Sequence, residues 1–472
     1  MIEFILNNKT IKTSLPSGMT LLDFVRYEQR LTGTKIGCRE GDCGACTNLV
    51  GSLNEDGTAV SYQSITSCIS PLGNAHGKHI VTVEGTNLEN KLTAAQNAMK
   101  DNYATQCGFC TPGFVVSLTG FALSNTKKTT DNALDAISGN ICRCTGYKSI
   151  ERAAYQLCEK LEHSDSNISM DTLIEKEVIP SYFKDIPNRL KAIQSTQQPN
   201  SNKKAVYGGT DIYVQKADSL IDGEVFTVGL NPDLKGIKIE GDKCTLGAGT
   251  TVTDLWNHTE LNRFFPNLRK HLKLVSSEQI RNMASFGGNF VNASPIGDMT
   301  IFFLALNSDI TIQNKDGNER TIALKDFYKS YKTFDLKEDE LLKTISFKLP
   351  TKYSKFNFEK VCKRTHLDIA SVNSAIHLKI ENDTVSEAHV SMGGVFEIPK
   401  YLHKTSDYLK GKTINPDVII KANNILQTEI SPISDVRGTS DYKRLLGRQL
   451  FFAHFTQLFP EQFQLNDFVA HA

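Results

Sequence analysis

The stretch GCREGDCGAC, residues 37–46, carries three cysteines in the order C-x4-C-x2-C, and a fourth, Cys68, follows after 21 intervening residues. This is the spacing of a plant-type [2Fe–2S] cluster, in which four thiolates hold two irons. Gly37, Gly41 and Gly44 suit a loop wrapped around a cluster, because glycine adopts positive φ and lets backbone amides point at sulfur. A zinc knuckle or a disulfide framework explains these glycines less well. We therefore interpret four residues as cluster ligands: Cys38, Cys43, Cys46 and Cys68.

Composition limits the class of protein. A chain of 472 residues has room for about three domains. With 53 Lys and Arg against 52 Asp and Glu, the net charge of +1 provides no global field for nucleic acid or anionic lipid. The sequence has no apolar run of 18 or more residues and opens with MIEFILN, unlike a signal peptide. We expect a soluble, cytoplasmic protein with no membrane or nucleic-acid partner, whose eleven cysteines are mainly ligands rather than disulfides.

The residues around the first cysteine group have strand and turn patterns. Residues 1–15 alternate as strands with a hairpin turn at Asn7 and Asn8, and residues 21–27 have helical spacing. The strand-like segments NLVGSL and SYQSI lead to Cys68, and HIVTVEG ends at Gly85. This order predicts a β-grasp, plant-type ferredoxin domain over residues 1–85.

A second cysteine group, in QCGFCTPG and GNICRCTGY, has the spacing C-x2-C-x31-C-x1-C. Alone, the CxxC pair could be redox-active or half of a zinc site, and the CxC pair could be incidental. Thr111 and Pro112 predict a helix start, Ser149 predicts the cap of another helix, and Cys158 falls on that helix's apolar face. Two helix hairpins would place four thiolates at one end of an all-α four-helix bundle over residues 86–162. The predicted ligands are Cys107, Cys110, Cys142 and Cys144.

The middle of the chain contains a linker and two glycine-rich stretches. The polar segment EHSDSNIS predicts a domain boundary, with a linker over residues 163–180. In AVYGGTDIYV, the Gly208–Gly209 pair resembles a turn that holds phosphate, although the signal is weak by itself. GAGTTV at 247–252 lacks the third glycine of a Rossmann fingerprint, so we reject that fold. Residues 280–299 mix glycine, hydroxyl and apolar residues, which favours a loop lining a ligand.

A basic group follows, formed by Lys360, Lys363 and Arg364. It is either a solvated basic face or a contact to an anionic cofactor. The eleven histidines are scattered without paired-ligand spacing, so no catalytic side chain is assigned. Three cysteines, Cys158, Cys244 and Cys362, have no assigned role.

Five motifs occur in one order, GCREGDCGAC, QCGFCTPG, GNICRCTGY, YGGTDI and ASFGGNFVNASPIGDM, and together resemble the iron–sulfur and flavin portion of xanthine dehydrogenases. The resemblance runs nearly end to end. It implies an α+β multidomain chain with a vanillyl-alcohol-oxidase-type FAD-binding α+β domain over residues 181–352 and a C-terminal α/β flavoprotein domain over 353–472. The chain departs from the family pattern at two positions. Val275 stands where many relatives have an aromatic residue over the adenine, and Lys332 stands in place of an arginine.

The resemblance also implies site residues. Gln106 and Cys144 correspond to positions that face a molybdopterin carried on another subunit. Residues 205–212 would wrap the FAD pyrophosphate, and further FAD contacts would come from a second loop and from the flavin ring. The implied FAD-binding residues are Ala205, Val206, Tyr207, Gly208, Gly209, Thr210, Asp211, Ile212, Ser285, Asn289, Ser294, Asp298, Leu342 and Lys360.

The resemblance implies an electron-transfer role in purine catabolism. A partner molybdopterin subunit would oxidise hypoxanthine or xanthine, and electrons would pass through two [2Fe–2S] clusters to FAD and on to NAD+. The chain is most similar to the small subunit of the two-subunit bacterial form, which implies a heterotetramer with two copies of each chain. The alternatives are another molybdenum hydroxylase acting on aldehydes, N-heterocycles or CO, and a flavin-free carrier or scaffold. A benzoyl-CoA reductase type would need additional cluster cysteines in the flavin domain, where only Cys244 and Cys362 occur.

Overall fold

A computed structural model describes residues 1–164, 167–193, 203–364 and 367–469. The chain divides into two compact units. The first unit consists of Met1–Asn231 together with Ser277–Ala284, and the second of Pro232–Ser276 together with Ser285–Ala472. Among the described residues, no helix is long and apolar enough to cross a membrane.

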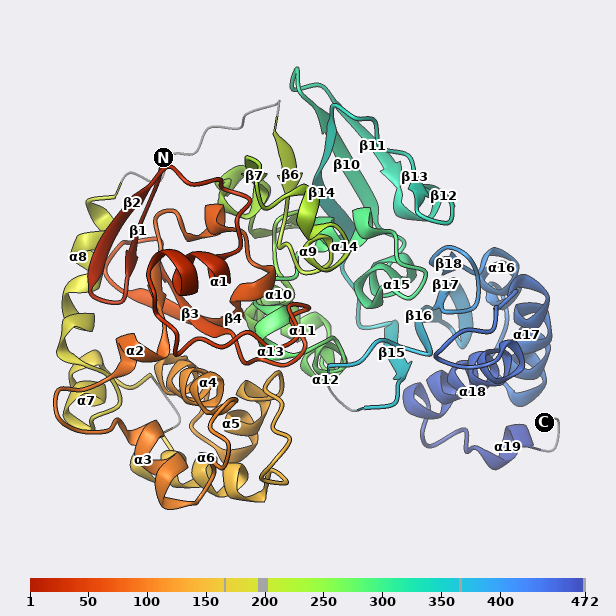
Figure 1. Cartoon of the computed structure of the whole chain (residues 1–472). Coiled ribbons are helices and arrows are strands. Elements are labelled where there is room, and N and C mark those ends of the chain that lie inside the picture. Colours follow the sequence, from red (N-terminus) through yellow and green to blue (C-terminus); the bar gives the residue numbers. More distant parts are fainter. Residues whose placement is uncertain (165–166, 194–202, 365–366, 470–472) are drawn as a thin grey trace. The chain divides into compact units, whose positions relative to one another are not determined.

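The N-terminal part of the first unit is a five-stranded mixed sheet (Figure 1). The strand order is β2-β1-β5-β3-β4, with β1 parallel to β5. Thr20 caps helix α1, which continues directly into a π-helical turn whose Phe24 ring packs 5.6 Å from the Phe4 ring. This topology confirms the predicted β-grasp domain. The elements are β1 (Ile2–Leu6), β2 (Lys9–Thr13), α1 (Leu21–Asp23), the π-helix Phe24–Glu28, β3 (Thr47–Leu53), β4 (Val60–Thr66), β5 (His79–Val81) and α2 (Val83–Thr86).

Four helices follow, and they confirm the predicted helical domain: α3 (Ala94–Asp101), α4 (Thr111–Leu123), α5 (Thr130–Ala136) and α6 (Lys148–Lys160). Helix α4 begins at Thr111 with Pro112 in its first turn, as predicted, and Cys158 is fully buried. The prediction that Ser149 caps the next helix is wrong. Tyr147 adopts a left-handed conformation with φ 69° and is the N-cap, so α6 begins at Lys148 and Ser149 lies inside its first turn.

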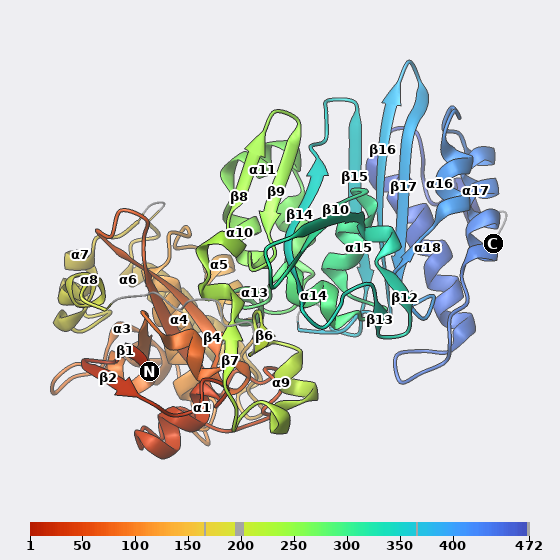
Figure 2. The same ribbon diagram turned by 90° about the horizontal axis from the view of Figure 1, so that it is seen from above.

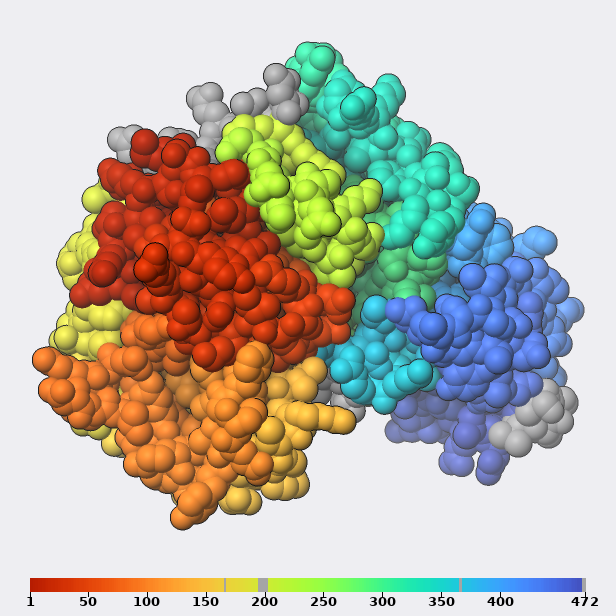
Figure 3. Space-filling model, viewed as in Figure 1, coloured from red at the N-terminus to blue at the C-terminus, as the bar shows by residue number. Residues whose placement is uncertain are grey.

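The sheet and the helices of the first unit share a core. Helix α4 packs on β3 and β4, where Gly120 lets the helix approach Leu49 closely. Phe114 on α4 is completely buried in the same cluster as Leu49. Burial of one such side chain contributes about 1.5–3 kcal/mol, so this shared core stabilises both domains at once. Residues 1–85 and 86–160 accordingly form one continuous surface, red and orange in Figure 3.

The rest of the first unit consists of short elements. Phe183 packs its ring 5.4 Å from Tyr62 of β4, which attaches this region to the β-grasp sheet. Helix α7 lies within the segment predicted as a linker, whose residues 165–166 lie outside the described residues, as do 194–202 of the following polar run. The elements are α7 (Met170–Glu175), the 3-10 helix Ser181–Asp185, α8 (Ile186–Lys191), β6 (Lys204–Val206), α9 (Ile212–Gln215), β7 (Val225–Thr227) and α13 (Glu278–Arg281).

The second unit contains a five-stranded sheet of order β11-β10-β14-β9-β8, with antiparallel neighbours. Antiparallel pairing of β9, which ends at Gly247, agrees with the rejection of a Rossmann fold. The prediction of a loop over residues 280–299 is wrong for Phe286–Asn292, which forms α14, and for Asp298, where α15 begins, whereas residues 282–285 and 293–297 lie outside helices. Phe286 and Phe290 are fully buried and anchor α14 despite its two glycines. The elements are β8 (Ile237–Glu240), β9 (Lys243–Gly247), α10 (Val252–Asn257), α11 (Thr259–Phe264), α12 (Leu268–Lys273), α14 (Phe286–Asn292), α15 (Asp298–Ala305), β10 (Asp309–Asn314), β11 (Glu319–Ala323) and β14 (Glu340–Lys348).

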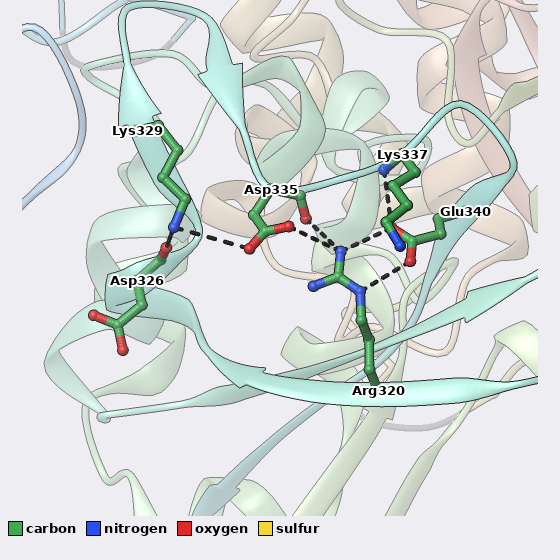
Figure 4. A network of polar contacts seen from close by, with 6 residues as sticks. All are labelled: Arg320, Asp326, Lys329, Asp335, Lys337 and Glu340. Atoms are coloured by element: carbon green, nitrogen blue, oxygen red, sulfur yellow. Dashed lines mark hydrogen bonds and ion pairs between the residues drawn. The ribbon is translucent and has the colours of Figure 1, made fainter.

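A charged network ties this sheet to the small hairpin of β12 (Tyr328–Ser330) and β13 (Thr333–Phe334) (Figure 4). The Arg320 guanidinium donates to both carboxylate oxygens of Glu340, at 2.9 and 2.7 Å, and to Asp335 at 3.0 Å. These hydrogen bonds lower the pKa of Glu340 to about 2, because the bidentate cation stabilises the ionised carboxylate. The network thus holds the hairpin against β11 and β14.

The C-terminal part is an antiparallel sheet of order β15-β16-β17-β18 with helices packed on it (Figure 2). Helix α18 packs on β15 and β16, and α15 on β16 and β17. The core is rich in Phe, including Phe451 and Phe455, both fully buried. The elements are β15 (Ser354–Val361), β16 (Val372–Glu381), β17 (Thr384–Gly393), β18 (Lys400–Tyr401), α16 (His403–Leu409), α17 (Pro416–Glu429), α18 (Ser440–Leu458) and α19 (Asn466–Val469).

Candidate functional site

The first cysteine loop has the geometry predicted for a cluster loop. The Cys38 amide donates to the Cys43 sulfur at 3.4 Å, and the Glu40 amide donates to the Cys38 sulfur at 3.3 Å. Gly41 has φ +78° and Gly44 has φ +67°, so both need glycine for conformation. The backbone of this loop therefore wraps around its own sulfur atoms.

Cys46 and Cys68 complete the first set from two buried positions, 2% and 4% exposed. Ser67 precedes Cys68 and donates from both its amide and its hydroxyl to the Cys46 carbonyl, at 3.3 and 2.7 Å. Ser67 therefore links Cys68 to Cys46. Hydrogen bonding from the thiols of Cys43 and Cys68 lowers the pKa of Cys38, and the same contacts raise the pKa values of Cys43 and Cys68. The thiolate is the form that binds metal.

The second cysteine set comes from two turns of the helical domain, with Cys107 and Cys110 between α3 and α4 and Cys142 and Cys144 between α5 and α6. The sulfur atoms of Cys107 and Cys144 are 3.4 Å apart, and both residues are exposed. The Cys142 sulfur is buried and lies 3.1 Å from the Thr145 hydroxyl. Burial, followed by hydrogen bonding with Cys142, raises the pKa of Cys110 to about 12. One pair of this set thus faces solvent and the other faces the bundle.

In a [2Fe–2S] cluster four thiolates are shared between two irons. Among the described residues, no three His, Cys, Asp or Glu side chains are grouped as ligands of a metal ion would be. The amide donors to Cys38 and Cys43 are of the kind that tune such clusters.

The predicted phosphate turn lies in the first unit. Ala205 and Val206 are in β6, Tyr207, Gly208, Gly209, Thr210 and Asp211 form the turn, and Ile212 begins α9. Gly209 has φ +85°, and a Cβ there would lie 2.6 Å from the Ile69 carbonyl. A Cβ at Gly208 would overlap the Met283 carbonyl. Both positions therefore require glycine. Neither has space for a side chain, and Gly209 also has a positive φ.

The second group of predicted flavin residues lies in the second unit. Ser285 caps α14 by accepting a hydrogen bond from the Gly288 amide at 3.3 Å. Asn289 accepts from the amide and the hydroxyl of Thr300, at 3.0 and 2.9 Å. The Ser294 hydroxyl accepts from the Ile296 amide at 3.4 Å. These contacts fix the turn between α14 and α15.

Asp298 and Lys360 form a buried ion pair of 2.7 Å, in which the Lys360 side chain is 1% exposed. Lys360 also donates to the Leu274 carbonyl at 2.9 Å, and Asn373 donates to Asp298 at 2.6 Å. The structure thus brings two predicted flavin residues together and adds Asn373. Nothing in the sequence around Asn373 identified it, because the contact joins residues 75 positions apart.

The rest of the basic group does not join this pair. Lys363 donates to the Val436 carbonyl at 3.3 Å and Arg364 to the Leu367 carbonyl at 2.6 Å, and both side chains are exposed.

Leu342, another predicted flavin residue, lies fully buried in β14 opposite Ile312.

The two positions that depart from relatives lie in the second unit. Val275 is 8% exposed. Lys332 has φ 57° and donates to the carbonyl and the side chain of Asn292, at the end of α14. Lys332 therefore links the β12–β13 hairpin to the helix that follows Ser285.

Four family models match successive parts of the chain. They are a 2Fe-2S iron-sulfur cluster binding domain over residues 4–72, a [2Fe-2S] binding domain over 82–155, an FAD binding domain in molybdopterin dehydrogenase over 182–351, and a CO dehydrogenase flavoprotein C-terminal domain over 358–458. The third spans parts of both units. The chain therefore carries two [2Fe–2S]-binding domains and an FAD-binding domain.

Curated relatives match nearly all of this chain and are themselves longer. A xanthine dehydrogenase of Oryza sativa subsp. japonica is 28% identical over 96% of this chain and 39% of its own length. Aldehyde oxidase 1 of Rattus norvegicus is 26% identical over 97% of this chain and 39% of its own length. The chain thus spans about two fifths of the curated relatives it matches.

Solved structures support the fold alone. A carbon monoxide dehydrogenase from Hydrogenophaga pseudoflava matches with a TM-score of 0.50 and 23% identity, over 53% of this chain and 88% of that chain. Quinoline 2-oxidoreductase from Pseudomonas putida 86 matches with a TM-score of 0.50 and 21% identity, over 55% of this chain and 90% of that chain.

The matched domains define an iron–sulfur flavoprotein. In sequence and in the order of its matched domains, the chain is similar to the iron–sulfur and flavin portion of molybdenum hydroxylases.

Proposed function

We propose that this chain is the electron-transfer subunit of a xanthine dehydrogenase and acts with a molybdopterin-binding large subunit in a heterotetramer. The partner oxidises hypoxanthine or xanthine. When bound, the two clusters carry one electron at a time, and FAD converts electrons into the hydride that NAD+ accepts. The observation that carries the proposal is the order of two complete cysteine sets and two flavin-domain models within one chain.

The residues of this chain have distinct tasks in the proposal. The ligands of the first cluster are Cys38, Cys43, Cys46 and Cys68, and those of the second are Cys107, Cys110, Cys142 and Cys144. Exposure of Cys107 and Cys144 leaves one edge of the second set open to a partner, so this cluster is the one that receives electrons from the molybdenum subunit. Gln106, which precedes Cys107, is also exposed and belongs to the same edge.

The proposed FAD contacts are those of the two groups described above, each taken by itself. The turn at 207–211 would hold the pyrophosphate through its backbone amides, and its two glycines have no room for a side chain because the Met283 and Ile69 carbonyls lie against them. Ser285, Asn289, Ser294 and Asp298 would form the second FAD contact region, and Leu342 and Lys360 would lie at the flavin ring. Lys360 is held by Asp298, so it would supply a positioned charge rather than a mobile one.

Reconstitution with the partner tests the proposal. The chain alone should reduce an artificial dye with NADH and show no turnover of xanthine. Adding the molybdopterin subunit should produce xanthine-dependent NAD+ reduction, and Cys144→Ser should impair it. Xanthine turnover by the chain alone, or full coupled turnover after Cys144→Ser with its cluster lost, would contradict the proposal.

Aldehyde oxidases provide a second candidate function, because their sequences match the chain almost as well as the xanthine dehydrogenases do. In this case the partner would oxidise aldehydes or N-heterocycles and the electron path in this chain would be the same. A substrate screen of the reconstituted complex separates the two candidates. Turnover of an aldehyde without turnover of hypoxanthine or xanthine would favour the second.

A further inference from the structure

We propose that Gln279 is a positioning residue that holds the two cysteine loops together and so sets the electronic coupling between their clusters. The inference rests on the proposed electron-transfer function. In the step concerned, one electron leaves a reduced cluster and enters an oxidised one, with no proton transfer and no bond change. The protein then contributes only the separation and the connection of the two loops.

The two loops are connected by direct contacts just before Cys142 and just after Cys43. The Ile141 amide donates to the Cys43 carbonyl at 3.0 Å. The Asn140 side-chain amide donates to the Gly44 carbonyl at 3.1 Å. Both contacts are within the first unit. Cys43 of the first set is therefore connected to Cys142 of the second set through one hydrogen bond, to Ile141, and one peptide unit.

Gln279 controls the orientation of Asn140. Its side-chain nitrogen lies 3.0 Å from the Asn140 side-chain oxygen, 3.0 Å from the Ser117 hydroxyl and 3.0 Å from the Ala136 carbonyl. Ser117 donates its own proton to the same Asn140 oxygen at 2.7 Å. With its oxygen occupied in this way, Asn140 must direct its NH2 group to Gly44.

The network lies where polar groups are costly to leave unpaired. Gln279 is 0% exposed, Ser117 1% and Asn140 5%. A buried acceptor without a donor carries its full desolvation penalty, so the network favours one orientation of the Asn140 amide, while the Gln279 side-chain oxygen is buried without a hydrogen-bond partner. The Thr47 hydroxyl, 3.2 Å from the Asn140 nitrogen, extends it into β3.

The helix that carries Gln279 is itself anchored to both cluster domains. Asn282 donates to the Ser64 carbonyl in β4 at 2.8 Å, and the Glu278 amide donates to the Ser138 hydroxyl at 3.4 Å. Helix α13 comes from the matched FAD-binding segment of the sequence, yet it packs within the first unit. Gln279 is thus a residue of the flavin domain that joins the two iron–sulfur domains.

Two substitutions test the role of the Gln279 amide. Gln279→Glu keeps the shape but cannot donate to the Asn140 oxygen, so Asn140 should turn and release Gly44. Gln279→Met keeps the length and removes all hydrogen bonding. Asn282→Ala is the matched control, because it removes the contact of the α13 C-cap to Ser64 and so loosens the helix while the Gln279 amide is kept.

The measurement is electron paramagnetic resonance of the full-length chain with both clusters reduced, together with iron content. The magnetic interaction between two reduced clusters depends on their separation and connection. We expect it to be weakened or lost in Gln279→Glu and Gln279→Met, with the iron content of the wild type, and unchanged in Asn282→Ala. The midpoint potential of the first cluster should also shift in the Gln279 variants, because Gly44 lies next to the ligand Cys43.

Other outcomes overturn the inference. Interaction and potentials equal to wild type in both Gln279 variants would contradict it, as would an equal change in Asn282→Ala. If the Gln279 variants do not accumulate, Ser117→Ala decides, since it removes one donor to Asn140 and should weaken the interaction partly. A wild-type chain without iron would overturn the proposed electron-transfer function as well. A wild-type chain with iron whose Gln279 variants behave as wild type would overturn only the role of Gln279.

Discussion

The amide of Ile141 donates a 3.0 Å hydrogen bond to the carbonyl of Cys43. Ile141 precedes Cys142, a predicted ligand of the second cluster, and Cys43 is a predicted ligand of the first. Two domains with separate folds therefore meet at their metal-binding loops. A shared core beneath the contact, with Leu49 and Phe114 in one cluster, keeps the loops from moving apart. This arrangement is what an electron path through two clusters needs.

Removal of one ligand from each set should remove one cluster at a time. Cys43→Ser should abolish one [2Fe–2S] signal and Cys110→Ser the other, since cluster line shape follows the local hydrogen bonding and exposure. Paramagnetic resonance and iron analysis measure the result, with about four irons expected in the wild type and about two in each variant. Cys362→Ser, at a cysteine outside both sets, is the control and should keep both signals. Zinc in place of iron would contradict the assignment.

The turn at Gly208 and Gly209 should be needed for flavin. Gly209→Val would place a branched side chain at φ +85°, against the Ile69 carbonyl, and should yield flavin-depleted protein that retains both clusters. Gly241→Ala, at φ +61° in the β8–β9 turn of the second unit, is a control for positive-φ strain away from the predicted turn. Flavin and iron are measured on the same sample. Stoichiometric FAD in Gly209→Val would refute the prediction.

The Asp298–Lys360 pair should stabilise the second unit through its burial. Lys360→Ala leaves a carboxylate unpaired inside the protein, at a cost on the order of 3 kcal/mol. Thermal unfolding should therefore occur earlier, and FAD content should fall while iron content is unchanged. The double variant Lys360→Met with Asp298→Asn should recover part of the stability, because no unpaired charge remains. Equal loss of iron and FAD in Lys360→Ala would indicate a general folding defect.

The Glu340 carboxylate should make stability depend on pH in the acid range. Hydrogen bonds from Arg320 lower its folded pKa to about 2, so its stabilising effect is complete above its ordinary pKa and is lost as pH falls through the folded value. Glu340→Gln should lower the free energy of unfolding by about 1–3 kcal/mol at pH 7 and by progressively less toward pH 2. Chemical denaturation at several pH values measures this difference.

The matched control for Glu340 is Glu319→Gln. Glu319 pairs with Lys343 at 2.6 Å on the same sheet, but its side chain is 44% exposed. Its loss should cost less than about 1 kcal/mol, because solvent screens an exposed pair. An equal effect of the two substitutions, or a Glu340→Gln effect independent of pH, would contradict the role assigned to the network.

Local sequence carried enough information for the folds of the first two domains and for the conformation of the first cysteine loop. The ligands and glycines of the first loop are close in sequence, and the positive φ of Gly41 and Gly44 was predictable from the geometry that a wrapped loop needs. The start of α4 at Thr111 was equally local, since Pro112 cannot continue a preceding helix.

The errors and omissions have tertiary causes. Residues 286–292 were predicted as loop because of their glycines, yet burial of Phe286 and Phe290 outweighs the low helix propensity of glycine. Ser149 lost its predicted role to a left-handed Tyr147. Gln279 lies 139 positions from Asn140 in sequence, so no local pattern could predict their contact.

The electron path can be followed by titrating the purified chain with NADH and recording visible absorption and paramagnetic resonance in the same samples. We expect the flavin band to bleach and two distinct [2Fe–2S] signals then to appear, because hydride enters at FAD and electrons reach both cysteine sets. Bleaching of flavin with no reduction of either cluster would contradict the electron path. Absence of flavin and iron from the chain would contradict the account as a whole.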